Sequence, residues 1–339
     1  MVAARFACVL SLSLLGAAAL AQTDPPPASV PAGQELDAAP ATVVVSGKRP
    51  GPGLWKVSKD GHVMWVFAMH SPLPQKMEWD SVRVERLVAQ SQEVLLRPGV
   101  SVTVGWMSGL GMLPSLIGLK KNPDGAELHD LLPADVYGRW TVLKQKYIGG
   151  DDGVERYRPF FAAEELLDAG LKKSGLSKGG EVANQIEKIA RKHDVKLTST
   201  GVSVTLEHPR EALKDFKKSQ MEDVACFTKT LESFEGDIDA MKLRANAWAN
   251  GNIAEIGKLD YAEREDTCND AMMNGSFARN NPAFQDMRER GRVAWMKTAE
   301  RALAKNASTF ALLSMSQVLG PKSYLAELQA RGYTVESPK

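Results

Sequence analysis

Short apolar and alternating runs predict β-strands near both ends of the chain. Residues 54–58 and 62–69 are two such runs. The Lys59-Asp60-Gly61 sequence between them is typical of a tight hairpin turn, because Asp and Gly accept positive φ angles. Short uninterrupted apolar runs elsewhere are typical of buried strands. On these criteria we expect strands at residues 42–45, 54–58, 62–69, 93–96, 195–206, 309–316 and 333–336.

Between the terminal strands, apolar residues recur at the spacing of helices. After Pro133, the side chains of Val136, Trp140, Leu143 and Tyr147 fall on one helix face, and proline is common in a first helical turn. The fold class that follows is α+β: a mixed central sheet formed from N-terminal and C-terminal strands, with a largely helical middle and helices packed around the sheet. We expect helices at residues 84–91, 133–147, 160–173, 181–193, 210–250, 284–305 and 321–331.

Residues 98–119 form an uncharged segment that contains several glycines and Pro114. Glycine and proline make this segment a poor membrane-spanning helix. We interpret it as an apolar flap over a groove. The alternative is a peripheral contact with a membrane or with an envelope protein.

The N-terminus has the three parts of a secretory signal peptide. Arg5 supplies a positive charge, residues 9–20 are apolar and uncharged, and residues 19–21 form an A-x-A cleavage site. We therefore expect export to the periplasm or the extracellular space, with cleavage after Ala21; the alternative is a membrane anchor. Residues 22–50 are rich in Pro and Ala and predict a flexible linker. Residues 51–339 would then form the folded domain.

Removal of the signal peptide changes the charge and the cysteine count. It takes away Arg5, so that 41 basic residues (42 minus one) face 41 acidic residues. Without a net positive charge, we expect no nucleic-acid partner and no basic field that attracts anionic lipid. Cys8 also leaves, and the remaining pair, Cys226 and Cys268, predicts a disulfide in an exported chain. Two unpaired, buried thiols are the alternative.

Common catalytic and cofactor motifs do not occur in this sequence. The five histidines are not spaced as H-x-x-x-H or H-E-x-x-H. No G-x-S-x-G elbow surrounds Ser71, Ser314 or Ser316, and no phosphate-binding loop is present. From these motifs we expect no cofactor.

Several short sequences near the two ends of the chain form a recognisable set. They are G-L-W-K-V at 53–57, W-V-F at 65–67, L-P at 73–74, the stretch from T-F to G-P at 309–321, and A-R-G-Y-T-V-E at 330–336. Together they resemble the opening and closing segments of the TraB/GumN family. The sequence A-W-A-N-G-N at 247–252 is similar to the family's helical insert.

The resemblance implies a site that this sequence has altered. Family members with an assigned activity, such as the Tiki-type proteases, are thought to bind a divalent metal through two G-x-x-H motifs and a carboxylate that follows the second strand. Such ligands can hold a metal that activates water. Here the first motif is F-A-M-H-S-P-L-P at 67–74 and the second is S-M-S-Q-V-L-G-P at 314–321. Ser71 and Gln317 therefore replace the histidines, and Arg97 stands at the carboxylate position, so we expect no metal.

If the fold is kept, Ser71, Arg97, Ser316 and Gln317 should converge in the family's groove. An arginine among neutral hydrogen-bonding groups suits a carboxylate or another anion that is bound without catalysis. His70 precedes Ser71, and strand alternation would point it away from this groove.

The sequence thus predicts an exported, catalytically degenerate TraB/GumN-like protein that acts as a periplasmic binding or scaffold module. The alternative is a metal-dependent hydrolase or protease with a site rebuilt around His70. A third hypothesis is a membrane-associated partner protein that uses residues 98–119.

Overall fold

The computed structural model describes residues 52–77, 79–104, 113–219, 223–236, 238–258, 267–269, 271, 276–280, 284–319 and 322–338. All of them belong to the larger of two units of the chain, residues 40–339. The expected signal peptide, the linker and the strand at 42–45 lie outside the described residues, and so do residues 105–112 of the expected flap.

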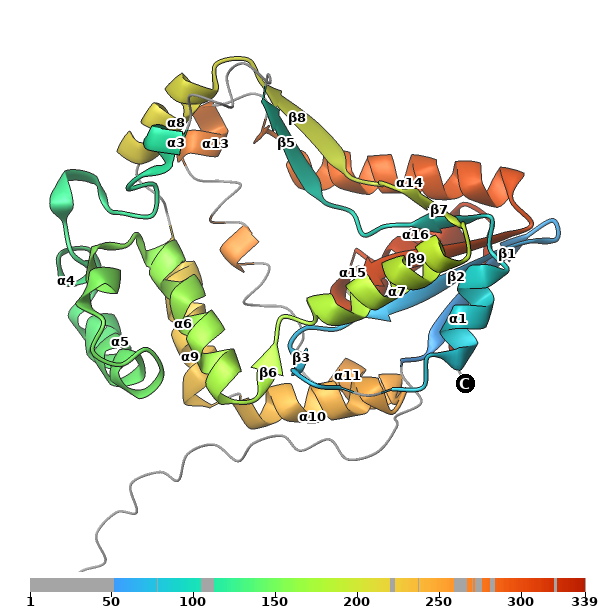
Figure 1. Ribbon diagram of the computed structural model, residues 1–339, viewed down its shortest axis with the longest axis horizontal. Helices are drawn as coiled ribbons and strands as arrows, with labels where there is room; N and C mark the ends of the chain where they lie inside the picture. The colour runs from blue at the N-terminus through green and yellow to red at the C-terminus, as the bar shows by residue number, and fades with distance from the viewer. Residues whose placement is uncertain are drawn as a thin grey trace, which may run out of the picture. The chain divides into compact units, whose positions relative to one another are not determined.

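A six-stranded mixed sheet joins the two ends of the domain (Figure 1). Its strand order is β10-β1-β2-β9-β4-β7. The outer pairs β10–β1 and β1–β2 are antiparallel, whereas β2, β9, β4 and β7 run parallel to one another. This arrangement confirms the predicted α+β class. The strands are β1 (Leu54–Lys59), β2 (His62–Met69), β4 (Glu93–Leu95), β7 (Lys196–Thr198), β9 (Ser308–Ser314) and β10 (Thr334–Glu336).

The turn between β1 and β2 is the predicted hairpin, but it has two residues rather than three because Lys59 belongs to β1. Lys59 pairs with His62, and Asp60 and Gly61 have φ angles of 52° and 85°. Positive φ at both central residues matches the right-handed twist of the flanking strands. The Asp-Gly pair therefore fixes the register of the first two strands.

Helices pack against the sheet and bury a continuous core. Within this core Phe67 of β2 contacts Phe310 of β9 and Trp248, with ring centroids 6.2 and 6.1 Å apart. The Trp248 indole N–H also donates to the Ala68 carbonyl at 2.8 Å, so the tryptophan's polar atom is satisfied where it is buried. The helices that supply this core include α1 (Val82–Ala89), α7 (Gly180–Lys192), α10 (Ile238–Ala249), α14 (Met287–Lys305) and α16 (Tyr324–Ala330).

A second apolar cluster lies among the helices of the middle of the chain. The face predicted for α5, formed by Val136, Trp140, Leu143 and Tyr147, is buried in it. Contributing elements are α4 (Leu128–Leu131), α5 (Ala134–Tyr147), the 3-10 helix η2 (Asp152–Arg156), α6 (Pro159–Lys173) and α9 (Val224–Glu235).

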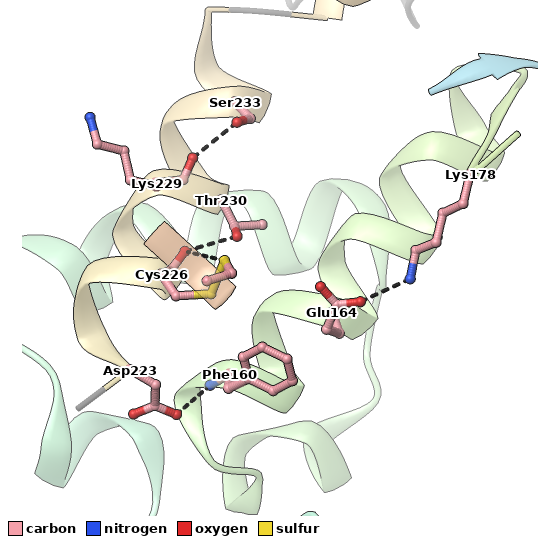
Figure 2. The surroundings of a disulfide bond; sticks show 9 residues. Phe160, Glu164, Lys178, Asp223, Cys226, Lys229, Thr230 and Ser233 are labelled. Carbon is pink, nitrogen blue, oxygen red and sulfur yellow. Dashed lines mark hydrogen bonds and ion pairs between the residues drawn. A yellow bond between two sulfur atoms is a disulfide. The ribbon is translucent and has the colours of Figure 1, made fainter. Parts of the chain in front are cut away.

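Beside this cluster, Cys226 of α9 lies at disulfide distance from Cys268, as predicted (Figure 2). Asp223, just before α9, accepts a hydrogen bond from the Phe160 N–H at 2.6 Å. The interaction joins the start of α6 to the start of α9.

Two predicted strands differ from the structure. The run at 195–206 is broken at Gly201, where any Cβ would overlap the Gly99 carbonyl. Only its first part, β7, joins the central sheet. The second part, β8 (Val202–Leu206), pairs in parallel with β5 (Val100–Val104), so the expected flap begins as a strand. The strand expected at 309–316 ends at Ser314 because the Ser314 hydroxyl accepts the Gln317 N–H at 3.2 Å and starts a helix.

The remaining elements are short. They are β3 (Leu73–Pro74), β6 (Leu176–Ser177), α3 (Leu113–Leu116), η1 (Pro123–Gly125), α8 (Pro209–Lys218), α11 (Ile253–Lys258), α13 (Ser276–Asn280) and α15 (Met315–Leu319). Within the described residues, no helix is both long enough and apolar enough to cross a membrane.

Candidate functional site

A small cavity lies where the parallel strands of the sheet end. β2 and β9 finish in register, with Met69 paired to Ser314, and β4 ends nearby at Leu95. The cavity holds about 40 Å³, which is enough for a few water molecules or one small polar group. We call it the strand-end cavity; its lining residues are Met69, His70, Ser71, Arg97, Lys178, Gly179, Ser314 and Ser316.

Three of the four residues predicted to converge line this cavity. Ser71 and Ser316 each stand two residues beyond the last paired residues of β2 and β9. Arg97 follows β4, and its side chain is exposed at the rim. In the described part of the chain, the Arg97 guanidinium forms no ion pair or hydrogen bond within the protein. Its five N–H donors are therefore available to a ligand.

Gln317 is not among the residues that line the cavity. Its side-chain oxygen accepts a hydrogen bond from the Ser314 N–H at 2.9 Å, which turns the amide back over the start of α15. The hydroxyls of Ser314 and Ser316 lie 2.9 Å apart. Gln317 thus stabilises the turn after β9, and Ser314 and Ser316 provide polar surface to the strand-end cavity.

His70 lines the same cavity as Ser71. β2 ends at Met69, so the alternation that we expected to carry His70 away from Ser71 stops one residue earlier. The side chain is 1% exposed. Burial, with a smaller contribution from the positive charge of Arg244, lowers the pKa of His70 from 6.5 to about 3. The imidazole is therefore neutral near pH 7.

Lys178 and Gly179 are the cavity residues that sequence reasoning missed. Lys178 forms ion pairs with Glu164 at 2.9 Å (Figure 2) and with Asp168 at 2.7 Å. Burial opposes its charge, but the hydrogen bonds to these carboxylates prevail and raise the pKa of Lys178 above its usual value. The Lys-Gly-Gly sequence before a predicted helix could have pointed to this location.

Gly179 brings the start of α7 to the cavity. Its φ is 72°, and a Cβ at this position would come within 2.8 Å of the His70 carbonyl oxygen. No side chain caps the N-terminus of α7. Because the first N–H groups of a helix lack partners within the helix and carry partial positive charge, this end of α7 adds to the positive character of the cavity.

The other histidines occupy separate places. The His62 ring lies 2.8 Å from the Asn306 carbonyl. His193 is 3.3 Å from Glu85, and His129 is 3.0 Å from Asp130. His208 immediately precedes α8. Among the described residues, no group of three or more His, Cys, Asp or Glu side chains is placed to hold a metal ion.

A larger cavity of about 520 Å³ lies between the end of α5, η2 and α6. Tyr147 and Val154 contribute to its apolar floor. Much of its charged rim is engaged within the protein: Glu165 pairs with Lys120 at 2.7 Å, and the Lys173 ammonium donates to the Lys146 carbonyl at 2.7 Å. Neither the predicted site residues nor the strand ends of the central sheet reach this cavity.

A family model described as the TraB/PrgY/gumN family matches residues 53–337. No curated protein and no solved structure matches the chain. The family match covers nearly all of the described residues, including every residue that lines the strand-end cavity.

Proposed function

Because this chain belongs to the TraB/PrgY/gumN family, we propose that it is an exported and catalytically degenerate member whose strand-end cavity binds an anion. The observation that carries the proposal is that Arg97, whose guanidinium has no partner within the described part of the chain, lines the same cavity as Ser71 and Ser316. The protein would act as a binding or scaffold module rather than as an enzyme.

The metal implied by the family resemblance does not fit these residues. Serine, arginine and glutamine occupy the three ligand positions at Ser71, Arg97 and Gln317. The Gln317 oxygen is already bonded to the Ser314 N–H. The cationic side chains of Arg97 and Lys178 line the same cavity and would repel a divalent cation. No reaction step through a metal follows from this set of side chains.

The same residues suit an oxyanion such as a carboxylate or phosphate. An arginine can form two parallel hydrogen bonds to a carboxylate, and serine hydroxyls can donate to the remaining lone pairs. Lys178 contributes less net charge, since Glu164 and Asp168 partly neutralise it. Arg97 is therefore the dominant attractive charge, and the start of α7 supports it.

Two features support the proposal of export. The first 21 residues have the charge, the apolar run and the small-residue cleavage site of a signal peptide. Cys226 and Cys268 lie at disulfide distance, and disulfides persist mainly in oxidising compartments. We therefore place the proposed function in the periplasm or the extracellular space.

The second candidate function is a hydrolase rebuilt around His70. The observation in its favour is that His70 lines the cavity and is neutral near pH 7. However, a base whose pKa is about 3 is weak at neutral pH, because efficient general bases have pKa values close to the working pH. The low pKa of His70 therefore favours binding over catalysis.

Metal content and hydrolysis distinguish these two candidates. We expect the purified protein to contain no stoichiometric divalent metal by inductively coupled plasma mass spectrometry. We also expect it to cleave peptide and ester substrates at the same rate as a His70→Asn variant. Bound metal at one per chain, together with turnover that a chelator abolishes, would show that the protein is an enzyme and would refute the proposal.

A further inference from the structure

An exposed apolar projection with lysines around it lies where α3 and α8 pack together. Ile117, just after α3, is 76% exposed, and Leu116 is 43% exposed. Ile117 is more exposed than any other large apolar side chain among the described residues. Covering an isoleucine that is this exposed to water with an apolar phase lowers the free energy.

α8 places basic side chains beside this projection. The Lys217 ammonium donates to the Ile117 carbonyl at 2.7 Å, which fixes one end of α8 against the turn after α3. Lys214 and Lys218 are exposed on the same helix. We call Leu116, Ile117, Lys214, Lys217 and Lys218 the α3–α8 surface. In Figure 1, α3 and α8 lie side by side near the ends of β5 and β8.

Charge is concentrated at this surface. Residues 113–121 and 209–218 together contain six basic side chains and two acidic ones, a net charge of +4 (six minus two), or +3 when Glu165, the ion-pair partner of Lys120, is included, whereas the whole chain carries only +1. The six are Lys120, Lys121, Arg210, Lys214, Lys217 and Lys218, and the two are Glu211 and Asp215.

We propose that the α3–α8 surface binds peripherally to membranes that contain anionic lipids. At a membrane interface, an apolar side chain inserts between the acyl chains while lysine ammonium groups remain at the level of the headgroups. Lysines near an anionic membrane surface each add to the attraction. A protein partner fits less well, because lysine is depleted from the centres of protein–protein interfaces.

This inference is independent of the anion proposed for the strand-end cavity. None of the residues of the α3–α8 surface lines that cavity, so either proposal can fail while the other holds.

Vesicle co-sedimentation tests the inference on the natively processed chain, whose first residue is established by N-terminal sequencing. The probes are vesicles of phosphatidylcholine alone and of phosphatidylcholine mixed with phosphatidylglycerol. Ile117→Asn should lower the partition coefficient for the mixed vesicles about tenfold. Val142→Asn is the matched control, because Val142 is 67% exposed on α5 outside this surface, and it should leave binding unchanged.

A second variant tests the charge. Lys214→Gln combined with Lys218→Gln should weaken binding to the mixed vesicles about tenfold or more and leave binding to phosphatidylcholine alone unchanged. The inference is overturned if the wild-type protein stays in the supernatant with mixed vesicles. It is also overturned if phosphatidylglycerol makes no difference, or if the Ile117 and Val142 variants lose binding equally.

Discussion

Replacing His70 by asparagine should flatten the dependence of stability on pH between pH 7 and pH 4. In the native protein, burial and the nearby charge of Arg244 keep the pKa of His70 at about 3. In the unfolded chain the same imidazole takes up a proton near pH 6.5. His70 therefore supports the native state fully above pH 6.5, and this support is lost as the pH falls toward 3.

The size of the effect follows from the two pKa values. At pH 4 the unfolded histidine is protonated and the native one is still neutral. The unfolded pKa lies about 2.5 units above pH 4, and each unit corresponds to about 1.4 kcal/mol. His70 therefore lowers the free energy of unfolding at pH 4 by about 3 kcal/mol. The wild-type protein should lose about this much more free energy of unfolding than the variant when the pH is lowered from 7 to 4.

Urea unfolding at pH 7 and pH 4, followed by tryptophan fluorescence, measures this difference. Other titrating groups are present in both proteins, so their contributions cancel. Asp223→Asn is a control with the opposite sign, because burial raises the pKa of Asp223 from 3.8 to about 6. That carboxyl makes the native state less stable as the pH rises from 4 to 6, by about 2 kcal/mol. If the free energies of unfolding of the wild-type protein and of His70→Asn differed by the same amount at pH 7 and at pH 4, the reasoning would be refuted.

Two further predictions concern stability. Replacing Cys226 and Cys268 by serine opens a loop with a sequence separation of 42, and urea unfolding should show a loss of about 4 kcal/mol. Peptide mapping after alkylation without reductant should find both cysteines unmodified, and two alkylated residues would contradict the pairing. Gly170→Ala should destabilise the protein by about 1–2 kcal/mol, because its Cβ would overlap the buried Phe234 ring. A Cβ at Gly138 on α5 would meet no atom within 4 Å, so Gly138→Ala should stabilise the protein by about 1 kcal/mol. If both alanine substitutions changed the free energy of unfolding in the same direction, that result would contradict this packing.

The elements that depend on local sequence were predictable. The Asp60-Gly61 hairpin needs only two residues that accept positive φ. The buried face of α5 follows from the spacing of Trp140 and its apolar neighbours. The meeting of both chain ends in one sheet followed from the position of the strands along the chain.

Features that depend on distant residues were not predictable from local pattern. The run at 195–206 divides because Gly201 packs against Gly99, a contact that no periodicity reveals. Ser71, Arg97 and Ser316 could be placed together only through the family resemblance, because they are far apart in sequence. Lys178 lies in the helical middle of the chain and reaches the cavity through the turn before α7, so nothing near the family motifs pointed to it.

Isothermal titration of small oxyanions tests the central claim most directly. Acetate and inorganic phosphate are titrated separately into the wild-type protein and into two arginine variants. Arg97→Gln should weaken binding about tenfold or more, because hydrogen bonds to a charged group are lost. Arg83→Gln, an exposed arginine on α1, should bind as the wild type does. The account would be contradicted if the wild-type protein bound neither acetate nor phosphate. It would also be contradicted if Arg97→Gln and Arg83→Gln bound these anions with equal affinity.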